Sequence, residues 1–452
     1  MSASWMRFLP GVFRRRLEGR TQYQKILGNI SWLSADRLIR MGVGLIVGVW
    51  VARYLGREFF GMLNFAAAFV ALFSPLAALG LESIVIRDCV ASPERRYQTL
   101  GTAFWLKLLG GIVAGTVAAA LVLATRPGEP VIQIMVVIAA TGVLFQSTDV
   151  IDYWFQSQVA AKFVVYARTI AFLAIAGVRV VLILLEAPVV AFAWAACAEL
   201  AIAAAGMAIF YRMEGGEFGA WRGSFERARG LLRDSWPLFF SVVFVAVYMK
   251  IDQVMLGYML DDAAVGLYSA AIRLVEMWYF LPAAIVASVL PALIRARGED
   301  ESFYLRKLQI LYDIMGGLAL LFALAMSLLS TPIIAILYGH KFEGAGPILA
   351  VYAWAAVPTF IGMASAQHFV VENRTRVTLY RTFAGAVASV LVNYLLIPLF
   401  GPLGAAFAFL VAQTVMVFSI VLIPGTGRQA GMLLAALNPM RAVGLLKEKK
   451  RS

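Results

Sequence analysis

The chain has 452 residues, of which 62% are hydrophobic and 14% are charged, and its formal net charge is +13. Soluble domains carry roughly 25% charged residues, so this composition, with a mean hydropathy of +0.82, excludes an ordinary soluble protein and indicates an integral membrane protein. The two cysteines exclude a disulfide framework, and the excess of Lys and Arg is attributed to cytoplasmic loops rather than to nucleic-acid binding.

The predicted elements begin with residues 1–28, where arginines alternate with Trp, Phe and Leu. This mixture predicts a basic interfacial segment on the cytoplasmic surface. A helix needs about 20 apolar residues to cross a membrane, and twelve such windows follow: 30–52, 61–80, 101–123, 131–154, 164–185, 188–210, 236–258, 265–290, 309–330, 346–369, 378–398 and 403–423. We therefore expect an all-α integral membrane protein with about 12 transmembrane helices.

The distribution of Lys and Arg predicts the orientation of these helices. With the N-terminus inside, 29 of the 39 basic residues fall in cytoplasmic segments, among them 371–381, which includes Arg381. Four fall in outer loops: Arg53, Arg57, Arg126 and Lys341. Positively charged loops stay in the cytoplasm, so both termini are predicted to be cytoplasmic.

The two halves of the sequence resemble each other. SWLSADRLIRMGVGLIVGVWVARYLGREFFGMLNFAAAF (31–69) aligns with SWPLFFSVVFVAVYMKIDQVMLGYMLDDAAVGLYSAAIRL (235–274), and the shared landmarks include Tyr54 with Tyr258 and Gly61 with Gly266. Two six-helix repeats of the same orientation, with a central cavity between them, are a transporter architecture. The predicted division is an N-lobe (29–211), a cytoplasmic linker (212–234), a C-lobe (235–425) and a basic cytoplasmic tail (426–452).

Charged residues within the membrane helices are the candidate functional residues. Arg or Lys at a helix centre costs about 2.5–3.5 kcal/mol, so such residues usually have a partner or a wet cavity. Arginine forks donate paired hydrogen bonds to phosphate, which predicts that the cations bind an anionic headgroup. The predicted substrate-binding residues are Arg37, Arg40, Lys250 and Arg273, and the predicted coupling or gating residues are Asp36, Asp252 and Glu276.

Simpler explanations stay open for several of these charges. Asp36–Arg40 and Arg273–Glu276 have the spacing of ion pairs within one helix. Lys250 and Asp252 are two residues apart, so they point to different sides of their helix.

The remaining charges in the apolar windows have less specific interpretations. Lys107 lies near the inner end of its helix, where its side chain is expected to snorkel. Arg179 and Glu199 are expected to pair across helices. A polar stripe on the fourth helix lines a vestibule or is merely solvated at the interface; it comprises Gln146, Asp149, Tyr153 and Gln156.

The sequence contains no zinc-ligand spacing, no GxSxG nucleophile motif and no P-loop. We therefore predict no enzymatic activity, no catalytic residue, no bound metal and no cofactor. Transport would then be driven by H⁺, Na⁺ or the membrane potential.

Three stretches together resemble the Wzx-type polysaccharide or O-antigen flippases of the multidrug/oligosaccharidyl-lipid/polysaccharide superfamily. They are VARYLGREFFGMLNFAAAFVALFSPLAALGLESIVIRD (51–88), DYWFQSQVAAKFVVYAR (152–168) and KIDQVMLGYMLDDAAVGLYSAAIRLVE (250–276). The resemblance implies two six-helix lobes and alternating access. It also implies that a polyprenyl-pyrophosphate-linked oligosaccharide moves from the cytoplasmic to the periplasmic leaflet of a bacterial inner membrane, for cell-surface polysaccharides such as lipopolysaccharide. Arginines of the first and eighth helices would hold the pyrophosphate, and Arg37 or Arg40, and Arg273, stand in these helices.

Other functions stay open at this stage. A multidrug cation antiporter of the same superfamily would need acidic and aromatic cavity residues, and a membrane-embedded polymerase or glycosyltransferase would need a catalytic outer loop. A scaffold for polysaccharide synthesis is a third alternative. The expected partners are lipid-linked oligosaccharide, membrane lipids, a polysaccharide polymerase and chain-length partners, and not nucleic acid.

Overall fold

The computed structural model describes the backbone of residues 21–372 and 374–438, and the side chains of this range except those of 21–39, 370 and 375. Every regular element in these residues is a helix. Ten of the described helices are long and apolar enough to cross a membrane, and an eleventh candidate is the bent pair Arg40–Ala71 and Ser74–Ala91. The last ten predicted windows each coincide with one of the ten helices, which confirms the all-α membrane fold.

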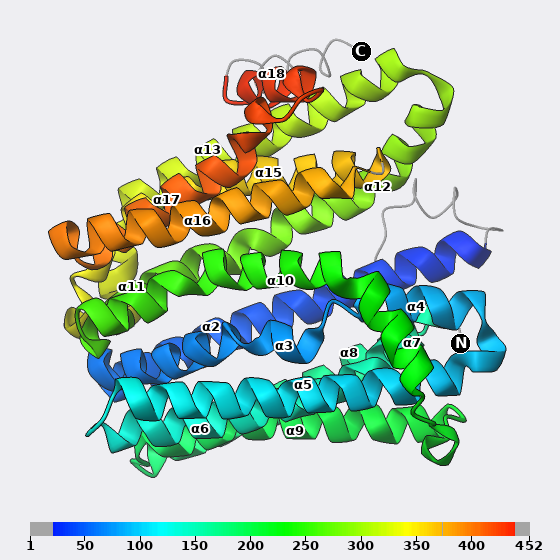
Figure 1. Ribbon diagram of the computed structural model, residues 1–452. Helices are drawn as coiled ribbons and strands as arrows, with labels where there is room; N and C mark the ends of the chain where they lie inside the picture. Colours follow the sequence, from blue (N-terminus) through cyan, green and yellow to red (C-terminus); the bar gives the residue numbers. More distant parts are fainter. Residues whose placement is uncertain (1–20, 373, 439–452) are drawn as a thin grey trace.

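The helices of the N-lobe run in the predicted order (Figure 1). They are α2 (Thr21–Ala71), α3 (Ser74–Ala78), α4 (Glu82–Ala91), η2 (Pro93–Arg95), α5 (Arg96–Thr125), α6 (Pro130–Leu144), η3 (Phe145–Thr148), α7 (Asp149–Ser157), α8 (Lys162–Leu184) and α9 (Val189–Met213). A short turn η4 (Phe218–Ala220) then leads to the long helix α10 (Phe225–Met259). Helix α10 therefore begins inside the segment 212–234 that was predicted as a linker.

The rest of the chain continues with α11 (Asp262–Glu276), η5 (Met277–Tyr279), α12 (Phe280–Glu299), α13 (Glu301–Tyr338), η6 (His340–Phe342), α14 (Ala345–Tyr352), η7 (Ala353–Ala355), α15 (Ala356–Val371), α16 (Thr375–Phe400), α17 (Pro402–Phe418), η8 (Ser419–Leu422) and α18 (Gly427–Ala435). Helix α18 buries Gln429, Ala430 and Leu433. The first residues of the predicted tail are thus a packed helix.

The first two predicted windows both fall on α2, which is interrupted at Gly56. Gly56 has φ 71° and ψ 176°, a backbone conformation that glycine adopts far more readily than other residues. Figure 1 shows the first arm of α2 running to one end of the molecule and the second arm, from residue 57, running back toward α3. The glycine therefore converts one stretch of helix into two neighbouring arms, one for each window.

Side-chain caps fix where the C-lobe helices begin. Asp261 accepts a hydrogen bond of 2.7 Å from the Ala264 backbone N–H at the start of α11. Asp300 caps α13 in the exposed turn after α12, where hydrogen bonds from Ser302 and from backbone N–H groups hold the pKa of its carboxyl below the usual value. The Asp261 cap fixes where α11 begins, and this helix carries two of the predicted site residues, Arg273 and Glu276.

Each of the two aligned glycines, Gly61 and Gly266, packs closely against a backbone carbonyl of the other lobe. A Cβ atom built on Gly61 would lie 1.7 Å from the Asp262 carbonyl oxygen, and one built on Gly266 would lie 1.8 Å from the Arg57 carbonyl oxygen. The shift of 205 residues that aligns Gly61 with Gly266 also aligns Arg57 with Asp262. The second arm of α2 and helix α11 therefore pack as pseudo-symmetric partners, with glycines allowing the backbones to touch.

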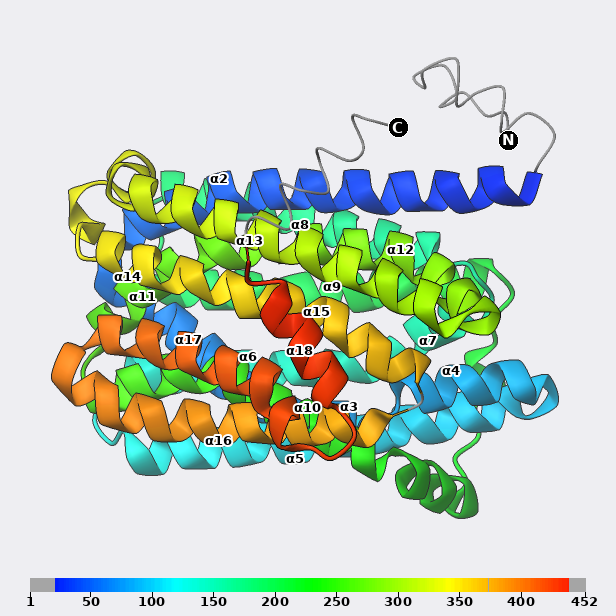
Figure 2. The ribbon, with the colours of Figure 1, turned by 90° about the horizontal axis from the view of Figure 1, so that it is seen from above.

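The buried core shows where the two lobes meet. One cluster joins both lobes and contains Val47 and Phe65 together with Tyr268 and Phe342. Of two further clusters, one is built from α4, α7 and the ends of α5, α8 and α9 together with Leu231 of α10, and the other from α12, α13, α15, α16, α17 and α18. These two clusters lie toward the predicted cytoplasmic segments, at the end of the molecule where Figures 1 and 2 show α4, α7 and α12. The start of α10 packs against the N-lobe at this end, where Arg227 bonds Asp88.

Candidate functional site

A cavity of about 540 Å³ lies between the N-lobe and the C-lobe. Helices α2 and α8 of the N-lobe form one side, and α11, η5 and α12 of the C-lobe form the other. The lining residues are Arg40, Met41, Gly44, Leu45, Phe172, Arg273, Glu276, Met277, Tyr279, Phe280 and Ala283. Three of the seven predicted site residues are therefore brought together in one cavity between the lobes.

Arg273 projects from α11 onto α2 and joins the two lobes at the cavity. Its Nη2 donates a hydrogen bond of 3.2 Å to the Gly44 carbonyl oxygen, and its guanidinium lies against Gly48. Among the described side chains, no carboxylate lies within 4.0 Å of Arg273. Glu276 and Glu199 act on its charge only from beyond ion-pair distance. The Gly44 carbonyl accepts the one hydrogen bond found for Arg273 among the described residues, and a guanidinium has five N–H donors in all.

Arg40 enters the cavity from the first arm of α2. Its Cζ lies 5.0 Å from the centroid of the Phe172 ring on α8, which is the distance of a cation–π contact. Of the two first-helix arginines proposed from the sequence, Arg40 lines the cavity, whereas the side chains of Arg37 and Asp36 lie outside the described residues. The cavity thus receives one arginine from each lobe.

Glu276 lies one turn after Arg273 but is not its ion-pair partner. The Tyr352 hydroxyl, from α14, donates a hydrogen bond of 3.4 Å to Glu276 Oε1. The structure therefore does not show the ion pair within one helix that the spacing allowed. The cavity presents two cations and one carboxylate that are free to act on different groups of a ligand.

Lys250 and Asp252 do not line this cavity. Asp252 is 1% exposed and accepts hydrogen bonds from the Tyr268 hydroxyl and from the Gln253 backbone N–H. Lys250 is half-buried on α10. As expected from their spacing they do not pair with each other, and their assigned roles stay predictions.

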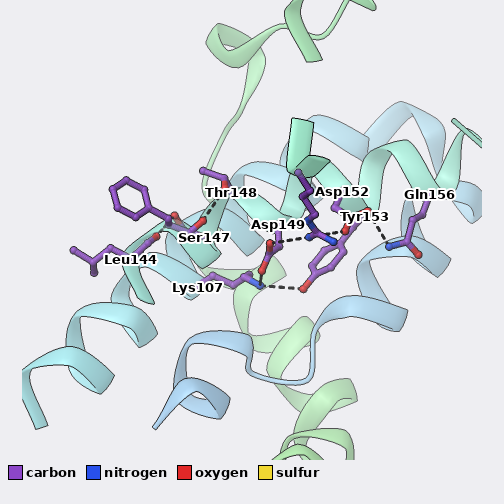
Figure 3. A network of polar contacts seen from close by, with 10 residues as sticks. Lys107, Leu144, Ser147, Thr148, Asp149, Asp152, Tyr153 and Gln156 are labelled. Carbon is purple, nitrogen blue, oxygen red and sulfur yellow. Dashed lines mark hydrogen bonds and ion pairs between the residues drawn. The ribbon is translucent and has the colours of Figure 1, made fainter. Parts of the chain in front are cut away.

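Lys107 belongs to a buried polar network in the N-lobe (Figure 3), and the expectation that it snorkels is wrong. It is 1% exposed, and its Nζ lies 3.3 Å from Asp149 Oδ2 and 2.9 Å from the Tyr153 hydroxyl. Arg168 also bonds Asp149 and, at 3.0 Å, Asp152. The charge is buried because carboxylates from the next helix neutralise it, so Asp149 and Tyr153 of the polar stripe face inward.

Two further findings concern charges in the apolar windows. Arg179 and Glu199 pair at 3.0 Å between α8 and α9, as predicted. Arg381 of α16, which the sequence placed in a cytoplasmic segment, is 3% exposed and donates to the Ser365 hydroxyl and to the Met416 carbonyl. Its position at the edge of an apolar window gave no sign of this burial.

At the predicted outer end, Arg126 joins the lobes. Its Nη1 lies 3.1 Å from Asp262 Oδ1, its Nη2 donates to the Gly257 carbonyl, and its Cζ lies 4.2 Å from the centroid of the Phe65 ring. Arg53 acts in a similar way, with Nε 2.6 Å from the Leu337 carbonyl at the end of α13. We name these contacts the outer clasp; counting Arg126 and Arg53 as loop residues gave no hint of it.

The comparisons with known proteins agree with this architecture. A family model described as polysaccharide biosynthesis protein matches residues 26–297, more than half of the chain, and a second model, MatE, matches residues 237–395. A probable flippase, AglR of Haloferax volcanii, is 27% identical over 172 residues. That alignment covers 37% of this chain and 36% of the relative, so the similarity spans only about a third of either protein.

Solved structures show the same fold. The lipid II flippase MurJ, in an inward closed conformation, has a TM-score of 0.70 at 14% identity, with 91% of each chain covered. An inward-facing multidrug resistance MATE family transporter of the MOP superfamily has a TM-score of 0.66 at 16% identity, covering 91% of this chain and 99% of that one. These relatives are transporters and flippases rather than enzymes. The chain is a multi-pass membrane protein that belongs to the polysaccharide biosynthesis protein family.

Proposed function

We propose that this protein is a flippase that moves a polyprenyl-pyrophosphate-linked oligosaccharide from the cytoplasmic to the periplasmic leaflet of a bacterial inner membrane by alternating access. The observation that carries the proposal is the cavity between the lobes, where Arg40 and Arg273 face the same space without a carboxylate on Arg273. Guanidinium groups in a site of low dielectric are well suited to hold a pyrophosphate. The cytoplasmic leaflet is the source of the cargo in this proposal because the buried core that the two lobes share lies toward the predicted outer end.

The membrane potential supplies a driving force for this direction. Moving one charge across 100 mV is worth about 2.3 kcal/mol, so moving two negative charges out of a cell whose interior is negative by 100 mV gains roughly 4–5 kcal/mol. The lipid tail would stay in the bilayer while the sugar crosses between the lobes. Coupling to H⁺ or Na⁺ is an additional proposal, for which Glu276 is the cavity-lining candidate.

The test uses proteoliposomes that contain the purified protein and a lipid-linked oligosaccharide placed in one leaflet. Wild-type protein should make the oligosaccharide accessible to an enzyme or lectin on the opposite side, and Arg273→Ala should abolish this movement while the protein stays folded. The matched control is Arg57→Ala, which removes an exposed arginine away from the cavity. Full transport by Arg273→Ala would remove the headgroup role, and no transport by wild-type protein with a range of lipid-linked sugars would remove the flippase proposal.

Export of organic cations is the second candidate function, and Glu276 is the observation that favours it. A carboxylate in the cavity, next to Phe172 and Tyr279, is the kind of site that holds a lipophilic cation. The two functions predict opposite effects of substitution. Cation export should be lost in Glu276→Gln and retained in Arg273→Ala, whereas lipid-linked sugar transport should be lost in Arg273→Ala.

A further inference from the structure

Gly48 on α2 lies directly beneath the Arg273 guanidinium. A Cβ atom built on Gly48 would lie 2.6 Å from Arg273 Cζ, 2.6 Å from Nη2 and 2.9 Å from Nη1. Separations under 3.0 Å are shorter than real Cβ contacts, so any side chain here would force the guanidinium to move. Bare backbone at this position is therefore required for the observed placement of Arg273.

The neighbouring glycines of α2 do not have this relation to Arg273. A Cβ on Gly42 would meet nothing within 4 Å, and a Cβ on Gly44 would make an ordinary contact of 3.5 Å with the Phe172 ring. Gly44 contributes its carbonyl oxygen, which any residue would also offer. Of these three glycines, only Gly48 is explained by the arginine of the other lobe.

The placement holds the arginine without neutralising it. Guanidinium has five N–H donors, and the hydrogen bond from Nη2 to Gly44 fixes one of them. The same side chain lines the cavity, with Arg40 on its wall. A phosphate entering the cavity would meet a cation whose orientation is already set by the backbone of α2, which reduces the ordering cost of binding.

We infer that Gly48 is a positioning residue for headgroup binding: it seats the Arg273 guanidinium against α2 so that donors from both lobes converge on one phosphate or pyrophosphate group. The inference rests on the proposed function, since it names how the same cavity recognises its ligand. Because the seat is on the N-lobe and the arginine on the C-lobe, the binding site is complete only while α2 and α11 are this close.

The experiment compares Gly48→Ala with Gly42→Ala. Both changes replace a helical glycine by alanine on the same helix, so both gain similar helix propensity, but only the first collides with Arg273. Each variant is placed in nanodiscs and titrated with a polyprenyl pyrophosphate, and thermal unfolding is measured in parallel. We expect affinity at least about tenfold lower for Gly48→Ala and unchanged affinity for Gly42→Ala.

Repeating the Gly48→Ala measurement in an Arg273→Ala background shows whether the loss of affinity arises from the displaced guanidinium or from a general disturbance of the fold. Removing the guanidinium removes the collision, so Gly48→Ala should then cause no further loss of affinity. An equal loss in both backgrounds would overturn the inference. If Gly48→Ala alone is not recovered as folded protein, the double variant Gly48→Ala/Arg273→Lys is compared with Arg273→Lys. We expect equal affinities. A further tenfold loss in the double variant would contradict the positioning role of Gly48.

The outcomes also distinguish this inference from the proposed function. If wild-type protein shows no saturable binding of polyprenyl pyrophosphate, the proposed function fails. If wild-type protein and Gly48→Ala bind polyprenyl pyrophosphate equally well, the proposed function stands and the positioning role of Gly48 is wrong.

Discussion

Breaking the outer clasp should open the predicted outer end of the protein. Arg126 is 7% exposed and combines an ion pair with Asp262, a hydrogen bond to the Gly257 carbonyl and a cation–π contact with Tyr258, whose ring centroid lies 5.2 Å from its Cζ. These partners lie on α10 and α11 of the C-lobe, whereas Arg126 follows the end of α5 in the N-lobe, so all three contacts cross between the lobes. Arg126→Leu removes these contacts together and leaves Asp262 buried without its cation.

The size of the effect follows from the contacts. A hydrogen bond to a charged group contributes about 1.5–3 kcal/mol, and a partly desolvated cation–π contact about 0.5–2 kcal/mol. Losing both should raise the free energy of the closed outer end by roughly 3 kcal/mol relative to an open one. Since 1.4 kcal/mol is a factor of ten, the ratio of closed to open molecules should fall by about a hundredfold.

The assay is a distance measurement between spin labels on opposite lobes. Leu185→Cys lies in the exposed turn after α8, and His340→Cys, at a position 98% exposed, lies after α13. Cys89 and Cys197 are both buried and are replaced by alanine in the labelled protein. Arg126→Leu should lengthen the distance between the labels, or add a second, longer population.

The control is Arg57→Leu, which removes an exposed arginine at the same end. No ion pair of Arg57 occurs in the described part of the chain, so its loss should leave the distances unchanged. Identical distance distributions for folded Arg126→Leu and wild-type protein would show that the clasp does not hold the lobes together. A shift of the same size in Arg57→Leu would show that net charge, rather than the clasp, controls the opening.

Three further predictions test the packing and the internal charges. Gly61→Ala should destabilise the lobe contact because its Cβ would lie 1.7 Å from the Asp262 carbonyl oxygen, and a lower thermal unfolding midpoint than wild-type checks it. Lys107→Met should lower the free energy of unfolding by about 3 kcal/mol, as breaking a buried pair does, measured by denaturant titration in detergent. Glu199→Gln should weaken the half-buried contact with Arg179 by about 1 kcal/mol, and Arg179→Leu in that background should cost less than it does alone in the same titration.

The helices could be predicted because their cause is local. About 20 consecutive apolar residues can satisfy their backbone groups in lipid only by forming a helix, so each of the last ten windows became a helix. The ends were less predictable because they depend on tertiary contacts. Helix α10 extends back to Phe225 because Arg227 bonds Asp88 and Thr99 of the N-lobe, contacts that no hydropathy window contains.

The candidate site was partly visible for a similar reason. Charges within apolar windows are conspicuous, so Arg40, Arg273 and Glu276 could be identified before their positions in space were known. Lys107 and Arg126 were misjudged because the sequence gives no sign of the carboxylate that each would meet. A buried cation is recognised only when its partner, here Asp149 for Lys107, is brought to it by packing.

The repeat explains which parts of the protein are symmetric and which are not. The register that aligns Gly61 with Gly266 also aligns helix α11 with residues 57–71, and the glycine contacts at the outer end obey this symmetry. The same register places Ala68 opposite Arg273 and Ala71 opposite Glu276. The two lobes therefore share a packing surface but not their cavity charges, and the N-lobe supplies Arg40 from the first arm of α2 rather than from the arm that aligns with α11. In the flippase that we propose, the symmetric contact would let the lobes rock about a common axis, and the asymmetric site would receive a cargo with one charged end and one neutral end.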